Sequence, residues 1–460
     1  MTTEARDQTL ALHGGPQAFA QMSGAAQPKI GVAEFMSIAE RFGFTPAALD
    51  RIRQAISDDD LGPGPNLARY ATAYPPETKG AAFEALARQK FGVQYALGVN
   101  SGTSALHCAM VALGVGPGTE VIVPAIGYYA TAAAVVAAKG APIFCDVDAS
   151  LHMDPTRLEA LITPRTVAVA PTHVMGSICN MAPIMEIARQ HNLKVVEDCA
   201  QSPGGKYGGR YVGTWGDIGC FSISCYKIIG GGEGGLVITN DERLWARANQ
   251  LAECGGLWRP DRFAPPRYDG ELFNGLNYRM SELEAAVDVV QLGKLDDVVR
   301  RYHDVKVRIL RQLRSFAGIT PQTLNDPAGE IGYRLVFYPA THELGQQIAA
   351  ALRAEGIPAG YRGPNARPDW HIYSDMYPIT LKTGTMPTDR PFDLPEYQER
   401  DGHVEYHAGL CPVADDLFSR SVSIPLNQWY TEADCDAIAA GINKVLAAFC
   451  PLGGQEAAWL

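Results

Sequence analysis

The sequence predicts an α/β protein whose large domain has a mostly parallel sheet flanked by helices, followed by a smaller α+β domain. Three observations lead to this prediction. Apolar runs of strand length alternate with helical stretches between residues 94 and 249. Two strand-like runs then follow one another without a helix, and a long helical pattern leads into a final region of mixed strands and helices. A chain of 460 residues is long enough for both domains.

The first 44 residues are expected to form an N-terminal arm, because the stretch up to about residue 28 is rich in Ala, Gly and Gln without periodicity. A helical pattern begins near Thr45. It is followed by a segment rich in Pro, Gly and Tyr over residues 58–78, which is too long for a simple turn. A lid or entrance loop is one hypothesis for this segment, and contacts within an oligomer are the other.

The large domain is expected over residues 45–310. Its predicted parallel strands are residues 95–99, 121–126, 142–147, 166–174 and 193–199. Helical patterns separate these runs, so helices should cover both faces of the sheet. In such a sheet, binding groups lie at the carboxyl ends of the strands.

The runs 217–224 and 234–240 have no helix between them and predict a hairpin added to that sheet. Apolar residues at helical spacing then predict a long helix over residues 281–316. The small domain is expected over residues 311–460. Its predicted strands are residues 334–338 and 421–426, and its predicted helices are residues 342–356 and 431–449.

Composition and charge narrow the class of function. Lys and Arg total 39 against 50 Asp and Glu, and the net charge of -11 gives no electrostatic footprint for nucleic acid or an anionic membrane. The ten cysteines form no CxxC pair, which favours reduced thiols in a cytoplasmic protein without a metal site. We found no basic start followed by an apolar run, and no uninterrupted apolar stretch of about 18 residues. A compact protein that binds a small molecule is the expected class.

The run Gly230–Gly235 matches the GxGxxG pattern of dinucleotide sites. A strand follows it instead of a helix, so the helix N-terminus that would hold a pyrophosphate is missing. No P-loop sequence is present either. The sequence therefore does not support a nucleotide site of either kind.

Three other positions together suggest a different cofactor. Ser101–Ser104 opens a predicted helix after a strand, which suits a phosphate, although ordinary helix capping explains the same residues. Asp198 ends a very apolar strand, where it either caps the next segment or serves a ligand. Lys227 follows another strand, where it is either a solvated charge or a desolvated nucleophilic amine. An anion site, an acid and an amine on one sheet are what pyridoxal phosphate requires, and Tyr128 or Tyr129 is placed to cover its ring.

These residues lie in stretches that resemble the DegT/StrS sugar aminotransferases, which are pyridoxal phosphate enzymes of fold type I. The similarity extends from roughly residue 45 to residue 448 and implies a seven-stranded sheet. The matching stretches are residues 99–125, 170–202, 213–227, 232–235, 275–287 and 420–434.

The resemblance implies a role for each matching site residue. Lys227 would form the Schiff base and then move protons between substrate and cofactor. Asp198 would pair with the pyridine nitrogen, Gln201 would lie near the ring oxygen, and Tyr128 would stack on the ring. The residues that would hold the phosphate are Gly102, Thr103 and Ser222, together with Asn277 from a neighbouring subunit. A shared site of this kind implies a homodimer.

Three further residues are candidates for substrate contact: His173, Arg279 and His371. His173 is as well explained as a hydrogen-bonded core residue, and His371 lies in a segment that would close over the acceptor. The chain also departs from the family, because Gly230 and Gly231 stand where two threonines are common. This departure puts the local substrate geometry in doubt.

The predicted function is transfer of an amino group from glutamate or glutamine to a keto sugar, nucleotide sugar or ketocyclitol, as in amino sugar and antibiotic biosynthesis. One alternative is a pyridoxal phosphate enzyme with a different specialised-metabolite substrate. The other is a regulatory homologue without turnover, which the presence of Lys227 argues against.

Overall fold

The computed structural model describes residues 9–19, 29–62, 67, 78–256, 265–384, 390–400, 402–453 and 458–460. The chain forms two compact units, Met1–Pro76 and Glu77–Leu460. The predicted domain limits at residues 44 and 310 stay predictions. Most of the segment rich in Pro, Gly and Tyr lies outside the described residues, at positions 63–66 and 68–77, as do residues 1–8 and 20–28 of the expected arm.

The described residues of the first unit form the α-helices α2 (Val32–Glu40) and α3 (Pro46–Ala55) and the short 3-10 helices η1 (Ala11–His13) and η2 (Asp58–Asp60). Helix α3 is the one predicted near Thr45. The Thr45 hydroxyl accepts a hydrogen bond from the Ala48 N–H at 3.3 Å, and Pro46 occupies the first helical position, where its missing N–H costs nothing.

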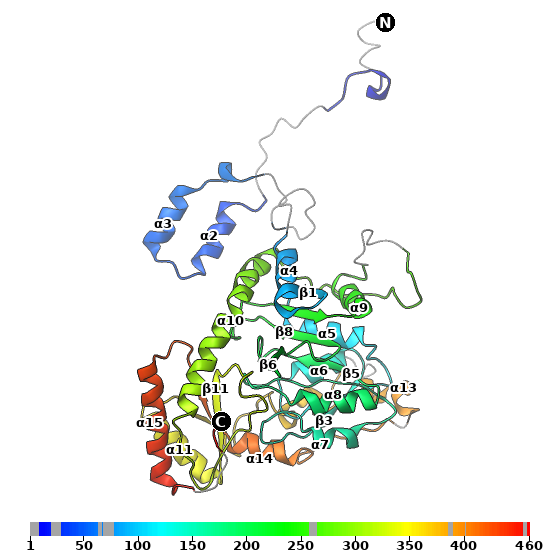
Figure 1. Ribbon diagram of the computed structural model, residues 1–460. Coiled ribbons are helices and arrows are strands. Elements are labelled where there is room, and N and C mark those ends of the chain that lie inside the picture. The colour runs from blue at the N-terminus through cyan, green and yellow to red at the C-terminus, as the bar shows by residue number, and fades with distance from the viewer. Residues whose placement is uncertain are drawn as a thin grey trace. The chain divides into compact units, whose positions relative to one another are not determined.

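The second unit is built on a seven-stranded sheet with the order β1-β9-β8-β5-β4-β2-β3 (Figure 1). Its strands are β1 (Tyr95–Val99), β2 (Glu120–Pro124), β3 (Ala141–Cys145), β4 (Thr166–Val169), β5 (Lys194–Asp198), β8 (Ile218–Ser222) and β9 (Gly235–Thr239). Strand β9 runs antiparallel to both of its neighbours, and the other pairs are parallel. The predicted mostly parallel sheet and its added hairpin are confirmed.

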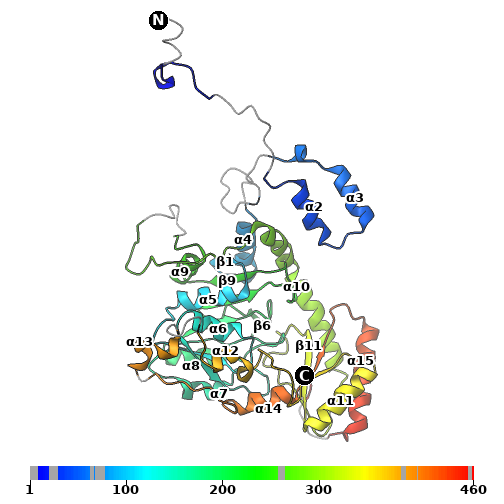
Figure 2. The same ribbon diagram turned by 180° about the vertical axis from the view of Figure 1, so that it is seen from behind.

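Helices cover both faces of this sheet, as Figures 1 and 2 show from opposite sides. Alternate strand residues belong to different cores: Leu97 and Val99 pack with α5 (Gly102–Ala112), α6 (Ala130–Ala137) and α9 (Glu242–Ala252), whereas Ala96 packs on the opposite face. That opposite face is covered by α4 (Lys79–Phe91), α8 (Met181–Gln190) and α10 (Glu282–Leu310). Because both faces are buried, the strands are almost continuously apolar.

The C-terminal part has its own antiparallel sheet, with the order β10-β11-β13-β12, and its own apolar core. The strands are β10 (Ile319–Pro321), β11 (Arg334–Pro339), β12 (Gly360–Tyr361) and β13 (Val422–Pro425), with the helices α11 (His342–Ala354) and α15 (Glu432–Phe449). The predicted small α+β region and the long helix α10 that leads into it are confirmed.

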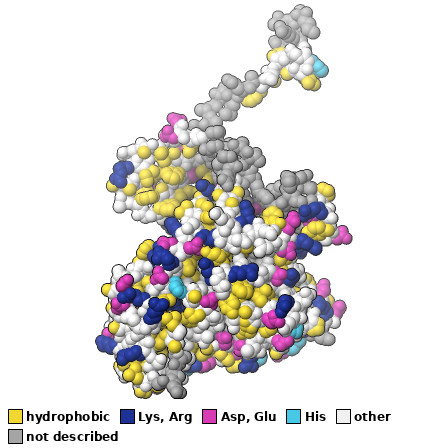
Figure 3. Space-filling view, viewed as in Figure 1, with side chains coloured by type: hydrophobic (Ala, Val, Ile, Leu, Met, Phe, Trp, Pro, Cys, Tyr) yellow, Lys and Arg dark blue, Asp and Glu magenta, His cyan; other side chains and the backbone are white. Residues whose placement is uncertain are grey.

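The remaining elements of the second unit are short. They are β6 (Lys206–Tyr207), β7 (Arg210–Tyr211), α7 (Pro155–Leu158), η3 (Glu159–Leu161), η4 (Tyr373–Asp375), α12 (Tyr377–Thr380), η5 (Pro391–Asp393), α13 (Pro395–Gln398) and α14 (Pro412–Arg420). Among the described residues, no helix combines the length and the apolar character needed to cross a bilayer. On the face seen in Figure 3, the Lys and Arg side chains of the described residues are interspersed with Asp and Glu.

Candidate active site

A cavity of about 740 Å³ lies at the carboxyl ends of β5 and β8, beside the N-terminus of α5. Its volume is in the range that small-molecule sites occupy, and its position is the one expected for a ligand of an open α/β sheet. Its wall includes seven of the residues named above as candidates for cofactor binding or catalysis. They are Gly102, Thr103, Tyr128, Asp198, Gln201, Ser222 and Lys227.

The N-terminus of α5 forms one wall of the cavity. Ser101 caps the helix, because its hydroxyl accepts a hydrogen bond from the Ser104 N–H at 3.1 Å. Gly102 and Thr103, the first two helical residues, line the cavity, where the partial positive charge of a helix N-terminus favours an anion. A Cβ atom at Gly102 would lie 2.6 Å from the Ser222 Cβ, so only glycine lets the end of β8 approach this closely. Capping and anion binding are therefore compatible here.

Asp198, the last residue of β5, is a buried carboxylate that is only 2% exposed. Its Oδ2 accepts a hydrogen bond from the Thr131 hydroxyl at 2.5 Å, and its Oδ1 accepts one from the Ala200 N–H at 3.0 Å. Two donors thus fix the carboxylate in one orientation at the cavity wall. Such a fixed negative charge suits a partner that carries a positive charge, as a protonated pyridine nitrogen does.

Lys227 lines the same cavity and is not a solvated surface charge. Burial lowers the pKa of its amine, and the negative charge of Asp198 partly opposes that effect by raising it. A lowered pKa increases the fraction of uncharged amine, which is the nucleophilic form. The Lys227 N–H donates to the Ser224 carbonyl at 2.9 Å, which holds the tight turn after β8.

Gln201 contains an unpartnered donor at this site. Its Oε1 accepts a hydrogen bond from the Met175 N–H at 3.0 Å, whereas its buried Nε2 has no partner within the described structure. Buried polar atoms are nearly always hydrogen-bonded, so a bound molecule with an acceptor would complete this group. The unpartnered amide and the cradle at Gly102 both fit pyridoxal phosphate, which carries a ring oxygen and a phosphate.

His371 lies on the cavity wall beside Tyr128, with the two ring centroids 5.3 Å apart. Backbone pairing holds the two segments together, because the Gly127 N–H donates to the His371 carbonyl at 3.0 Å. The His371 Nδ1 lies 2.7 Å from an oxygen of Asp369, and this contact lowers the pKa of Asp369. His371 is therefore held in place at the cavity, as a substrate-contacting residue requires.

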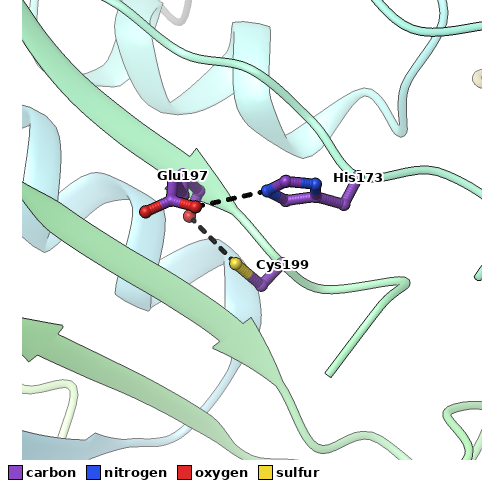
Figure 4. Close-up of side chains that lie close together, drawn as sticks. All are labelled: His173, Glu197 and Cys199. Atoms are coloured by element: carbon purple, nitrogen blue, oxygen red, sulfur yellow. Dashed lines mark hydrogen bonds and ion pairs between the residues drawn. The ribbon is translucent and has the colours of Figure 1, made fainter. Parts of the chain in front are cut away.

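His173 does not line the cavity, although it follows the end of β4. It is fully buried against Glu197 and Cys199, as Figure 4 shows. Its Nδ1 accepts the Cys179 N–H at 3.1 Å, so Nε2 carries the proton and faces Glu197 Oε2 at 3.4 Å. The geometry favours the interpretation of His173 as a core hydrogen-bonding residue.

The group His173, Glu197 and Cys199 has side chains of metal-ligating type, but its ligand atoms are already engaged. Glu197 accepts hydrogen bonds from the N–H groups of Gly213 and Gly216, at 2.8 and 2.6 Å. Burial raises the pKa of the Cys199 thiol well above its usual range, which disfavours the thiolate that a metal needs. In the described structure this group forms a buried hydrogen-bonded network.

Asn277 and Arg279 also lie outside the cavity wall. Asn277 is exposed, and its Oδ1 accepts the Arg279 N–H at 3.3 Å. Arg279 forms an ion pair with the buried Glu253 at 3.1 Å. The expected roles of Asn277 in the site of a neighbouring subunit and of Arg279 in substrate contact stay predictions.

The cavity wall also includes residues that the sequence did not indicate, among them Tyr302, Tyr333, Arg334 and Glu233. Arg334 is the cation among them. One of its amino groups donates to the Ser423 hydroxyl at 3.0 Å, and its buried Nε has no hydrogen-bond partner within the described structure. The sequence showed only an arginine at the start of a predicted strand, which is ordinarily an exposed position. No local pattern distinguishes it.

Comparison with known proteins agrees with this geometry. The family model described as the DegT/DnrJ/EryC1/StrS aminotransferase family matches residues 75–374. The GDP-perosamine synthase of Caulobacter vibrioides is 35% identical over 357 residues, which cover 77% of this chain and 86% of that protein. The L-glutamine:2-deoxy-scyllo-inosose aminotransferase of Streptoalloteichus tenebrarius is 31% identical over 364 residues, with coverage of 77% and 83%.

Solved structures show the same fold. The aminotransferase from Psychrobacter cryohalolentis is 26% identical with a TM-score of 0.66, and the match covers 84% of this chain and 99% of that one. The crystal structure of 3-amino-5-hydroxybenzoic acid synthase is 27% identical with a TM-score of 0.64, covering 80% and 91%.

Proposed function

The chain belongs to the DegT/DnrJ/EryC1/StrS aminotransferase family, whose members depend on pyridoxal phosphate, and we propose that it transfers an amino group from glutamate or glutamine to a keto group of a nucleotide sugar or cyclitol. The observation that carries this proposal is that Lys227 and Asp198 line one cavity at the N-terminus of α5. The relatives named for a GDP-sugar and for an inosose support the acceptor class, since both names denote polyhydroxylated compounds.

The chain's own residues would hold the cofactor at three points. Gly102, Thr103 and Ser222 would bind its phosphate at the helix N-terminus. Asp198 would keep a positive charge on its ring nitrogen, and the free Gln201 Nε2 would donate to its ring oxygen. When bound, pyridoxal phosphate supplies an electron sink that stabilises negative charge on the carbon bearing the amino group.

Lys227 would carry out the proton transfer. Its Nζ is partly desolvated, which favours the uncharged amine that can accept a proton from the α carbon of the amino donor. The same Nζ, once protonated, would donate that proton to the cofactor and not back to the α carbon, which completes the proton transfer. A single amine thus acts as base and then as acid, and the cavity keeps it beside the reacting carbon.

The exposed position of Asn277 supports a homodimer with shared sites. In the proposed dimer, Asn277 of each subunit would contribute to the phosphate site of the other. Subunit mixing tests this arrangement: Lys227→Ala and Asn277→Ala proteins, each poorly active alone, should recover activity when they are mixed and allowed to exchange subunits. A mixture no more active than its two components would contradict a shared site.

The reaction itself is tested with the purified protein loaded with pyridoxal phosphate. L-glutamate or L-glutamine should shift the cofactor absorbance to that of the pyridoxamine form, and a panel of keto sugars and ketocyclitols should reverse the shift. A spectrum that stays unchanged with every amino donor would instead favour the regulatory homologue.

Arg334 is expected to bind the carboxylate of the amino donor. An Arg334→Leu variant should show a KM for the donor raised roughly 10- to 100-fold, since a hydrogen bond to a charged group contributes about 1.5–3 kcal/mol. Steady-state kinetics with varied donor and fixed acceptor measures the effect. Arg308→Leu removes a half-buried arginine that is paired with Asp436 and does not line the cavity, and it serves as the control. If only the acceptor KM rises in Arg334→Leu, the arginine binds the acceptor instead.

A further inference from the structure

Asp288, on the second turn of α10, is a carboxyl group in an unusual environment. The residue is 0% exposed, and neither of its side-chain oxygens has a hydrogen-bond partner within the described structure. Lys, Arg and His side chains of the described residues form no ion pair with it. A buried carboxylate without a partner is very costly, so a group in this position is stable only when it carries its proton.

The segment that carries Lys227 packs directly on this carboxyl group. A Cβ atom at Gly231 would lie 2.0 Å from Asp288 Oδ1, and one at Gly234 would lie 2.5 Å from Oδ2. The two glycines therefore leave the space that the carboxyl group fills. This contact gives a physical reason for Gly231 at a position where the resembling family commonly has threonine.

The same segment is tied into a compact loop. The Ile223 N–H donates to the Gly234 carbonyl at 2.8 Å, and the Gly231 N–H donates to the Ile223 carbonyl at 3.1 Å. Lys227 lies between these two ends. A displacement of Gly231 or Gly234 would therefore move the backbone on which Lys227 is mounted.

The charges around Asp288 all oppose its ionisation. Glu284, one helical turn earlier on α10, has an unpartnered buried Oε1 and repels a charge on Asp288. Glu233, on the packed loop, acts on Glu284 in the same sense. Burial together with Glu284 raises the pKa of Asp288 to about 8.

We propose that Asp288 is a positioning residue whose uncharged carboxyl group fills the space at Gly231 and Gly234 and thereby holds the Lys227 segment in its reactive geometry. The proposal depends on the proposed function only for the role of Lys227. Ionisation of Asp288 places a negative charge against the loop backbone and Glu284, and the loop then shifts to admit water. Activity and stability should fall together as the proton is lost.

Thermal unfolding tests whether the Asp288 carboxyl group is protonated in the folded protein, and it does not depend on enzyme activity. The folded-state pKa of Asp288 is raised, so the folded protein binds more protons than the unfolded chain, and stability falls as pH rises from about 4 to about 8. Asp288→Asn keeps the shape of the side chain but removes the group that titrates. Its Tm relative to wild type should rise steadily between pH 5 and pH 8.5. A Tm difference that does not change with pH would overturn the proposal.

The pH profile of kcat tests the positioning role. The ratio of kcat in Asp288→Asn to kcat in wild type should increase by up to about tenfold from pH 7 to pH 9, because a group with a pKa of about 8 is mostly ionised at pH 9. Glu284→Gln removes the repulsion and should move the alkaline limb of the wild-type profile to lower pH. Asp304→Asn changes an exposed charge on the same helix and should leave the profile unchanged. Profiles that coincide in all four proteins would overturn the proposal.

A double-mutant cycle tests the packing. Gly231→Thr places a side chain where the carboxyl group lies, so it should lower Tm and kcat strongly in the wild-type background. Asp288→Ala empties that space and should rescue Gly231→Thr in both measurements. If the losses of Tm and kcat in the double variant equal the sums of the losses in the two single variants, the contact does not position the loop. If kcat fails in every variant while the Tm effects appear, the proposed reaction is wrong and the packing inference stands.

Discussion

Replacing Lys227 with alanine is expected to lower kcat for transamination by at least about 10³-fold, because one change removes both the covalent anchor and the proton-transfer group. Lys227→Arg keeps a positive charge but has no nucleophilic amine, so it should be as inactive as the alanine variant. Single-turnover reaction with L-glutamate, followed by cofactor absorbance, measures the loss. Lys194→Ala, which removes an exposed lysine paired with Asp217, should retain full activity.

Hydride reduction identifies the attachment point in the same set of proteins. Reduced wild-type protein should carry the cofactor on the peptide that contains Lys227, and reduced Lys227→Ala should carry none. A Lys227→Ala protein that still forms the same reducible adduct would show that another amine is the anchor. The lowered pKa of Lys227 also predicts that the adduct forms at a lower pH than an ordinary lysine would allow.

Asp198→Asn is expected to lower kcat by about 10²- to 10³-fold, the size of loss seen when a charge-stabilising group is removed from a buried site. The amide occupies the same space but keeps only one acceptor oxygen for the two donors, Thr131 and Ala200, so the loss combines the charge with one hydrogen bond. The effect should fall mainly on kcat, measured with saturating donor and acceptor.

Thr131→Val is the matched variant for Asp198. It removes the hydroxyl donor at 2.5 Å but keeps the carboxylate charge, so its kcat should fall much less than that of Asp198→Asn. Equal losses in the two variants would mean that orientation, and not charge, is what the carboxylate provides. Full activity in Asp198→Asn would show that the reaction does not need the carboxylate charge.

The sequence predicted the large sheet well because its strands are strongly marked. Both faces of the sheet are buried, so strands such as β5 are continuous apolar runs, and the helices between them force parallel pairing. The same logic predicted that Asp198 and Lys227, each near a strand end, would share one edge of the sheet. Their placement on one cavity wall agrees with that expectation.

Other site features depend on contacts between residues distant in sequence. Arg334 belongs to β11 of the C-terminal sheet and lines the cavity together with residues of the seven-stranded sheet, and nothing in the residues around it indicates that approach. The hydroxyl of Thr131 donates to Asp198, which lies 67 positions later in the chain. His173 was ambiguous in the sequence because its role depends on Glu197, which is 24 positions away and lies 3.4 Å from its Nε2. Such pairings are set by packing and not by local pattern.

Helix α10 contacts both the loop that carries Lys227 and the C-terminal region. Its 29 residues make a rod of about 44 Å at 1.5 Å per residue. Near its start, Asp288 touches the loop of the reactive lysine, and near its end, Lys306 forms a buried ion pair with Glu330 in the C-terminal region. One continuous helix therefore contacts both the loop of Lys227 and the C-terminal region. We expect substitutions at the Lys306–Glu330 pair to affect the position of that loop as well as the local packing.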